Sequence, residues 1–337
     1  MSGKASGPLV SVIVPFYNIE GCVRYCLESL LNQTFDDYEV VCVDDGSTDR
    51  TGELLDLYAQ ADERVRVLHK ENGGISDARN HGVSHARGDY ISFVDGDDVV
   101  APHYLATLYG VLGEDASNVM AISGIRTISE KRASSRLDWP QWDGSWICIS
   151  QQEAARQVIM KNIATTAYGK MATRAFYETH PFDVAVRYDE ALIASVILGI
   201  GQFRVAKCAT YGYVMHPDSM IRSTATNEEA LDYADAIQTG KEAFLREYPD
   251  LKEQIAYWDA IYAARFHATV GKMDSPDPAL GELDAQMRKI AKKRASAIAL
   301  NGELGTAKRL RVLLYLFAPF VHDKAISIYN RTFKGID

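Results

Sequence analysis

Three carboxylates stand at the end of a short apolar run, Tyr90–Val94. The run alternates β-branched and aromatic residues, which predicts a buried strand. Asp95, Asp97 and Asp98 follow it directly, with Gly96 between the first two. Carboxylates this close repel one another unless a cation or a hydrogen-bonding ligand lies between them, and oxygen ligands suit Mg²⁺ or Mn²⁺. The segment therefore predicts a metal site of the kind that holds a diphosphate.

The first hundred residues alternate between strand and helix patterns. Each apolar strand pattern is followed by a segment whose apolar residues recur at helical spacing. Such alternation predicts an α/β fold with a mostly parallel, doubly wound sheet. The expected strands are Leu9–Pro15, Tyr38–Val43, Val65–Leu68 and Tyr90–Val94.

All four expected strands end in polar or glycine-rich sequence. In a doubly wound sheet, ligands bind outside the carboxyl ends of the strands, where the loops carry polar side chains. The four loops are therefore expected to converge on one ligand site at one edge of the sheet. They are residues 15–18, 44–47, 70–74 and 95–98.

Four sequence blocks together resemble a known family. They read S-V-I-V-P-F-Y-N at 11–18, V-D-D-G-S-T-D at 43–49, N-G-G-I-S-D-A-R-N at 72–80 and G-D-Y-I-S-F-V-D-G-D-D at 88–98. Their order and spacing resemble the donor half of the inverting glycosyltransferases of family 2, which have the Rossmann-like GT-A fold. The resemblance covers about the first hundred residues and implies a nucleotide-sugar donor site there.

The first two blocks imply contacts to the nucleoside. By resemblance, Pro15, Tyr17 and Asn18 belong to the donor site, and Tyr17 lies against the uracil ring, where a flat aromatic face provides stacking and burial. Asp45 accepts a hydrogen bond from the base N3–H, which favours uracil over cytosine. The alternative for Tyr17 is a core tyrosine at the end of a strand.

The last two blocks imply contacts to the diphosphate. Gly74 allows a close backbone approach, and Arg79 lies near a helix start, where guanidinium and helix dipole both favour phosphate. A surface salt bridge is the alternative role of Arg79. The resemblance implies that Asp95 lies near the ribose or the metal, and that Asp97 holds the Mn²⁺ or Mg²⁺ that bridges the donor phosphates.

The resemblance places a catalytic base in the second half. Asp189 and Glu190 follow an aromatic residue where the family has its acidic pair, and Glu190 aligns with the family's base, although the order of the pair leaves both open. A helix start that favours two carboxylates is the alternative. Lys170 is expected near acceptor or phosphate, and His216 near the metal and diphosphate as a ligand, while a structural histidine is the alternative there.

Beyond residue 100 the pattern indicates a less regular half. Strands are expected over 119–127, 146–149 and 203–215 with a helix over 152–161, and helices dominate from Asn227 onward. We therefore expect a GT-A domain over 1–225, with a donor half (1–100) and an acceptor half (101–225). A C-terminal helical region, 226–337, follows it.

The net charge of −9 is unevenly distributed. From Gln286 to the end there are eleven Lys and Arg against three Asp and Glu, or +8, which leaves −17 for residues 1–285. An acidic body argues against nucleic acid as a partner, and the basic tail, 286–337, indicates contact with an anionic membrane. The segment 308–320 joins basic to apolar residues and suits a membrane interface, although a helix packed on the body explains it equally well. The C-terminal helices suit a homodimer as well as a membrane contact.

The start of the chain and its cysteines indicate the compartment. Residues 1–8 are small and polar, without the pattern of a signal peptide, and no apolar run of about 20 residues is present to span a bilayer. Five cysteines without a C-x-x-C pair favour buried thiols in a reducing cytosol. The expected location is cytoplasmic, peripheral on the inner face of the plasma membrane.

The expected function is metal-dependent transfer of a sugar from a UDP-sugar to a hydroxyl of a glycan or a lipid-linked glycan, with inversion. The resemblance implies a role in bacterial surface polysaccharide synthesis. Two alternatives remain at this point. One is a sugar nucleotidyltransferase, which also uses paired aspartates on an α/β fold. The other is a catalytically inactive, nucleotide-sugar-binding scaffold.

Overall fold

The computed structural model describes residues 7–113, 116–184, 194, 196–216, 226–271, 273, 275–302 and 304–318. The chain divides into two compact units: residues 1–151 with 166–216, and residues 152–165 with 217–337. The domain boundary expected at residue 225 falls outside the described residues. The helix that starts at Gln151 belongs, from Gln152 on, with the second unit, which sequence patterns did not indicate.

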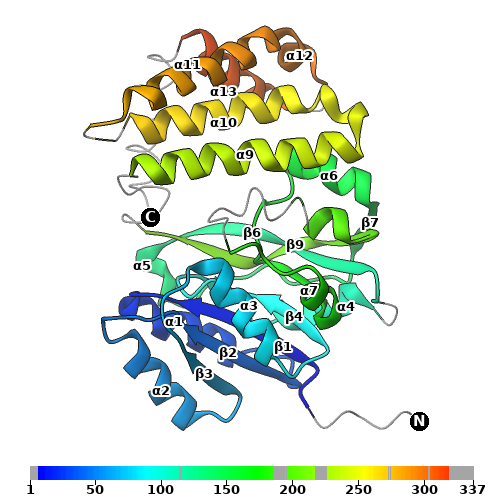
Figure 1. The fold of residues 1–337 in the computed structure, drawn as a ribbon. Coiled ribbons are helices and arrows are strands. Elements are labelled where there is room, and N and C mark those ends of the chain that lie inside the picture. Colours follow the sequence, from blue (N-terminus) through cyan, green and yellow to red (C-terminus); the bar gives the residue numbers. More distant parts are fainter. Residues whose placement is uncertain are drawn as a thin grey trace. The chain divides into compact units, whose positions relative to one another are not determined.

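The first unit is built on a nine-stranded sheet (Figure 1). Its donor half is parallel throughout, in the order β3-β2-β1-β4, which confirms the doubly wound prediction. Phe16 pairs with Asp44, and Asp44 pairs with His69, so the loops after these strands begin level with one another. The four strands are β1 (Val10–Phe16), β2 (Tyr38–Asp44), β3 (Val65–His69) and β4 (Tyr90–Phe93).

The other half of the sheet is mixed. It continues from β4 in the order β8-β6-β9-β5, and β7 pairs with β9. β8 runs antiparallel to both β4 and β6, whereas β9 runs parallel to β6. The strands of this half are β5 (Val99–Val100), β6 (Val119–Ser129), β7 (Trp146–Ser150), β8 (Lys170–Thr173) and β9 (Gln202–Met215).

Helices cover the two faces of the parallel half because successive side chains of a strand point to opposite faces. Val12 and Val14 belong to the buried cluster that contains the apolar face of the first helix. Ile13, between them, contacts Gly82 of the third helix. The helices of this unit are α1 (Glu20–Leu31), α2 (Thr51–Ala61), α3 (Ile75–His85), α4 (Tyr104–Leu112), α5 (Glu130–Ala133) and α7 (Arg174–Thr179).

The second unit is helical (Figure 1). Thr226 and Glu229 form a capping box at the start of its longest helix, in which each side chain accepts a backbone N–H of the other. Its helices are α6 (Gln151–Ile159), α9 (Asn227–Glu247), the 3₁₀ helix η1 (Pro249–Lys252), α10 (Ile255–Val270), α11 (Pro278–Lys293), α12 (Ala295–Leu300) and α13 (Thr306–Phe317).

The helix α13 packs its apolar stripe into the second unit. Val312, Tyr315 and Leu316 are buried in a cluster with residues of α10, and the Tyr315 hydroxyl donates a hydrogen bond to the Ala263 carbonyl at 2.8 Å. Of the two roles expected for residues 308–320, a membrane-interface segment or a packed helix, the packed helix describes α13. Among the described helices none combines the length and apolar character needed to cross a bilayer.

Candidate active site

Asp45 is held at the centre of the loops that follow β2 and β3. Its carboxylate is buried and accepts hydrogen bonds from the Lys70 ammonium at 2.6 Å and from the backbone N–H groups of Gly73 (3.0 Å) and Gly74 (2.8 Å). Gly74 has a φ of +86°, which favours glycine, and it precedes the first turn of α3. The predicted donor residues Asp45 and Gly74 therefore lie in direct contact.

Asp44, the residue before Asp45, also holds together the ends of β2 and β3. It accepts the Ser47 N–H at 3.1 Å, and its second oxygen lies 2.9 Å from Nδ1 of His69. The pKa of His69 is raised, first by this hydrogen bond to Asp44, and a further hydrogen bond to Asp56 adds to the effect. The His69 imidazole thus links the ends of β2 and β3.

The loop after β1 presents an aromatic ring to solvent. Tyr17 is 49% exposed, which rules out the core role and leaves its face free to stack. Asn18 instead braces the loop, because its side-chain oxygen accepts the Thr48 N–H at 2.7 Å and its backbone has a φ of +51°. Pro15 is buried within β1.

Asp95 is paired with a buried guanidinium. Arg79 is 2% exposed, and its Nη2 lies 3.1 Å from the Asp95 carboxylate, while its guanidinium carbon lies 5.5 Å from the Phe182 ring centroid. A surface salt bridge does not describe this arrangement, because the guanidinium is buried and is paired with Asp95. Contact of Arg79 with a diphosphate remains a prediction.

Gly96 allows the aspartate turn to lie directly on β1. A Cβ at Gly96 would stand 2.6 Å from the Phe16 ring and 2.8 Å from the Pro15 carbonyl oxygen. Any larger residue would displace the turn from the end of β1. The glycine between Asp95 and Asp97 is therefore required for their placement.

Asp97 is a partly buried carboxylate that fits a bound cation. Burial raises its pKa, and the neighbouring His216 only partly offsets this. In the described residues no three His, Cys, Asp or Glu side chains group as a ready-made metal site. Mg²⁺ and related ions use one or two carboxylates together with substrate phosphates and water. Asp97, with Asp95 beside it, fits that ligand pattern.

Asp98 has a structural role. It is 1% exposed, accepts the Tyr211 hydroxyl at 2.6 Å and accepts the Val214 N–H at 2.7 Å. The Tyr211 hydroxyl in turn accepts the backbone N–H of Asp95 at 3.1 Å. Burial raises the pKa of Asp98 well above its usual range, with Asp97 and Asp95 adding to the effect. Asp98 therefore fastens the aspartate turn to β9.

We expect Asp98→Ala to lower the free energy of unfolding by about 2 to 3 kcal/mol, because the Tyr211 hydroxyl and the Val214 N–H lose a buried acceptor. Asp98→Asn keeps a polar partner and is the control, with a smaller loss. Chemical denaturation of wild type, Asp98→Ala and Asp98→Asn measures the two losses in the free energy of unfolding. Equal stability of Asp98→Ala and wild type would contradict the fastening role.

His216 lies at the aspartate turn, although its ring nitrogens face protein oxygens. Nε2 is 3.2 Å from the Asp97 carbonyl oxygen and 3.2 Å from the Tyr25 hydroxyl, and Nδ1 is 3.3 Å from the Glu130 carboxylate. His216 therefore lies beside Asp97, the residue predicted to hold the metal. As a metal ligand it would have to exchange one of these contacts, so that role stays a prediction.

Lys170 is enclosed by protein. It is 1% exposed, and its ammonium donates to the carbonyl oxygens of Thr166 at 2.6 Å and Tyr168 at 3.4 Å. Its strand, β8, lies between β4 and β6. A direct contact with acceptor or phosphate would require the ammonium to leave these carbonyls. The predicted base residues, Asp189 and Glu190, lie outside the described residues.

Several residues of the site carried no signal in the sequence. Tyr211 and Tyr25 reach the aspartate turn from segments remote along the chain, and only the fold brings them there. Lys70 begins the expected loop 70–74, and His69 is the last residue of β3, and their contacts with Asp45 and Asp44 follow only from the fold. These residues form the support on which Asp45, Asp95 and Asp97 rest.

The comparisons with known proteins agree with this geometry. Residues 11–178 match the family model of glycosyl transferase family 2, and the chain belongs to that family. An uncharacterized glycosyltransferase from Bacillus subtilis, EpsJ, is 44% identical over 125 residues, which are 37% of this chain and 36% of EpsJ. Chondroitin synthase from Pasteurella multocida is 29% identical over 218 residues, which are 63% of this chain and 21% of that protein. The matched segment thus spans little more than a third of EpsJ and less of the synthase.

Solved structures of S. aureus TarS share the fold. The structure of its residues 1–349 with UDP-GlcNAc superposes with a TM-score of 0.55 at 18% identity, covering 86% of this chain and 89% of that chain. At this identity the likeness shows the GT-A fold alone.

Proposed function

We propose that this chain is an inverting glycosyltransferase that moves a sugar from a UDP-sugar to a hydroxyl of a glycan or lipid-linked glycan. The observation that carries the proposal is the meeting of four strand-end loops around Asp45, Asp95 and Asp97 in a family 2 domain. The complex of TarS with UDP-GlcNAc supports a UDP-sugar as donor, by likeness of fold.

Each loop contacts a different part of the donor in this proposal. Tyr17 offers an exposed ring for the base, and Asp45 offers a carboxylate that accepts the base N3–H. The N–H groups of Gly73 and Gly74 and the ammonium of Lys70 keep that carboxylate in place. Its position is therefore set before the nucleotide arrives, which reduces the cost of ordering on binding.

In the proposed reaction an acceptor hydroxyl forms a bond to the anomeric carbon as the bond from that carbon to the UDP oxygen breaks. Glu190 or Asp189 takes the hydroxyl proton, and UDP leaves with its negative charge. Mn²⁺ or Mg²⁺, held by Asp97 with Asp95, would neutralise charge on the departing diphosphate. Attack from the face opposite the leaving group inverts the anomeric configuration.

The setting that we propose is bacterial surface polysaccharide synthesis at the cytoplasmic face of the plasma membrane. The poly(ribitol-phosphate) beta-glucosyltransferase of Bacillus spizizenii, 39% identical over 114 residues, supports the polysaccharide part of this proposal. Those residues are 33% of this chain and 18% of that protein.

UDP release from a panel of UDP-sugars, with glycan acceptors added, tests the proposal. We expect acceptor-stimulated release with one sugar and, by NMR, a product of opposite anomeric configuration to the donor. A product of retained configuration would overturn the inverting mechanism. Nucleotide binding without turnover on any acceptor would favour the scaffold alternative.

A further inference from the structure

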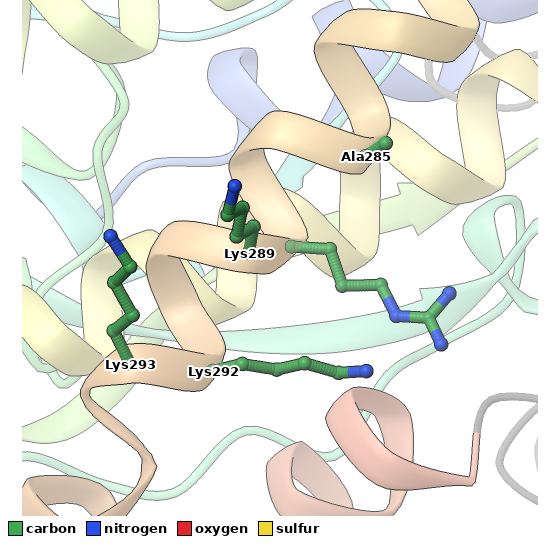
Figure 2. Close-up of a pocket in the computed structure, with 5 residues that line it drawn as sticks. Ala285, Lys289, Lys292 and Lys293 are labelled. Atoms are coloured by element: carbon green, nitrogen blue, oxygen red, sulfur yellow. The ribbon is translucent and has the colours of Figure 1, made fainter.

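The helix α11 carries a cluster of cations on one face. Arg288, Lys289, Lys292 and Lys293 line a shallow hollow together with Ala285, and Figure 2 shows the lysines projecting from successive turns of the helix. Positions three or four residues apart are neighbours on a helix surface, as Lys292 is with both Arg288 and Lys289, and Lys293 is with Lys289. Three of the four, the lysines, are exposed. We call these four residues the α11 basic face.

Few anions balance this face. Two carboxylates, Glu282 and Asp284, precede the cations on α11, and Asp284 is paired with His267 at 2.8 Å. Residues 285–318 contain eight Lys and Arg, and the single acidic residue in that stretch of sequence, Glu303, lies outside the described residues. Of the eight, Arg294 is paired with Asp259 at 3.1 Å, and Lys308 donates to Asn162. The face therefore presents a positive potential to solvent.

An exposed aromatic side chain lies beside these cations. Phe317, at the end of α13, is 62% exposed, and its ring centroid lies 5.8 Å from the Lys292 ammonium. Ile290, within the same stretch of α11, is 46% exposed. The apolar stripe of α13 is packed against α10, whereas the Phe317 ring at the end of the same helix is exposed to solvent.

We propose that the α11 basic face, with Phe317, docks on a bilayer surface rich in anionic lipid. Lysines near such a surface gain attraction from its negative potential, and a neighbouring aromatic ring inserts at the headgroup level. Opposite charge together with an apolar anchor identifies the occupant as a membrane, since a soluble polyanion would use the charges alone. This inference concerns the helical unit and does not depend on the proposed donor chemistry.

Vesicle co-sedimentation of the full chain tests it. The test variant replaces Lys289, Lys292 and Lys293 by Gln. The control replaces three other exposed cations, Arg24, Arg246 and Lys252, by Gln and so changes net charge equally. Circular dichroism of each protein establishes that it is folded. The probes are phosphatidylcholine vesicles with and without phosphatidylglycerol, and soluble polyphosphate.

We expect wild type and control to bind the anionic vesicles and not the neutral ones. The Lys289, Lys292 and Lys293 variant should bind on the order of 100-fold more weakly, at about 1 kcal/mol per cation. Phe317→Ala, which removes an exposed ring, should weaken vesicle binding and leave polyphosphate binding unchanged. Equal losses in test and control variants, absence of wild-type binding, or polyphosphate binding as tight as vesicle binding would each overturn the proposal.

Discussion

Asp97→Asn is expected to reduce the rate of sugar transfer by at least about 100-fold, because a cation at a leaving phosphate contributes several kcal/mol to the transition state. The variant keeps the shape of the side chain and removes its charge. Metal-dependent UDP binding should be lost with it. Initial-rate kinetics at saturating donor and a Mn²⁺ titration measure the two effects.

The same variant should be as stable as wild type or more stable. The pKa of Asp97 is raised by burial, so the folded protein favours the protonated carboxyl more than the unfolded chain does. A raised pKa contributes stability at low pH that is lost as the pH rises through the folded-state value. At neutral pH the ionised Asp97 is therefore unfavourable to the fold, and removing the charge relieves this.

Asp95→Asn is the matched control for that stability effect. It removes the ionic partner of Arg79, whose guanidinium is 2% exposed, and should lower the free energy of unfolding by roughly 2 kcal/mol. Thermal melts without metal compare the two variants. A destabilised Asp97→Asn, or one that transfers sugar at the wild-type rate, would contradict the role assigned to Asp97.

Glu190→Gln is expected to lower kcat by about 10² to 10⁴, the usual contribution of a positioned general base. The amide cannot take the acceptor proton, whereas the donor site is unaffected. UDP binding measured by calorimetry should therefore equal that of wild type. Single-turnover rates at saturating donor and acceptor give the expected loss directly.

Asp189→Asn distinguishes the two neighbouring carboxylates. If Glu190 is the base, this variant should keep most of the transfer rate. A full rate in Glu190→Gln together with a large loss in Asp189→Asn would reassign the base to Asp189. Full rates in both would place the base elsewhere in the acceptor half.

The parallel half of the sheet was predictable because its signals are local. Each of β1 to β4 is a short apolar run bounded by turn residues, and α1 carries Val23, Cys26, Leu27, Leu30 and Leu31 at helical spacing. The first four are buried, and Leu31 is half-buried. The polar strand ends then follow from the rule for doubly wound sheets.

The mixed half was less predictable because its signals are not local. β8 is four residues long and begins with Lys170, so its place between β4 and β6 depends on pairing with segments far along the chain. β5 has two residues. Such strands have too few positions for alternation to be recognised.

At the active site, too, the sequence predicted the motif residues and not the tertiary contacts that hold them. The motif residues Tyr17, Asp45, Asp95 and Asp97 stand at loops that sequence could place. The burial of Arg79 and the fastening of Asp98 by Tyr211 depend on tertiary contacts with no sequence pattern. For Asn18, the residue type suited a ligand contact, and the positive φ that makes it a loop brace is visible only in the folded chain.

Isothermal titration of UDP, GDP and dTDP into the protein, with and without Mn²⁺, tests the central claim most directly. Asp45 as acceptor and Asp97 as metal ligand predict UDP binding that is tight with Mn²⁺, weak without it and lost in Asp97→Ala. Because dTDP shares the base N3–H, its affinity reports on the fit around the ring and the ribose. Preference for GDP, or absence of nucleotide binding with Mn²⁺ present, would contradict the assignment of these loops as a UDP-sugar site.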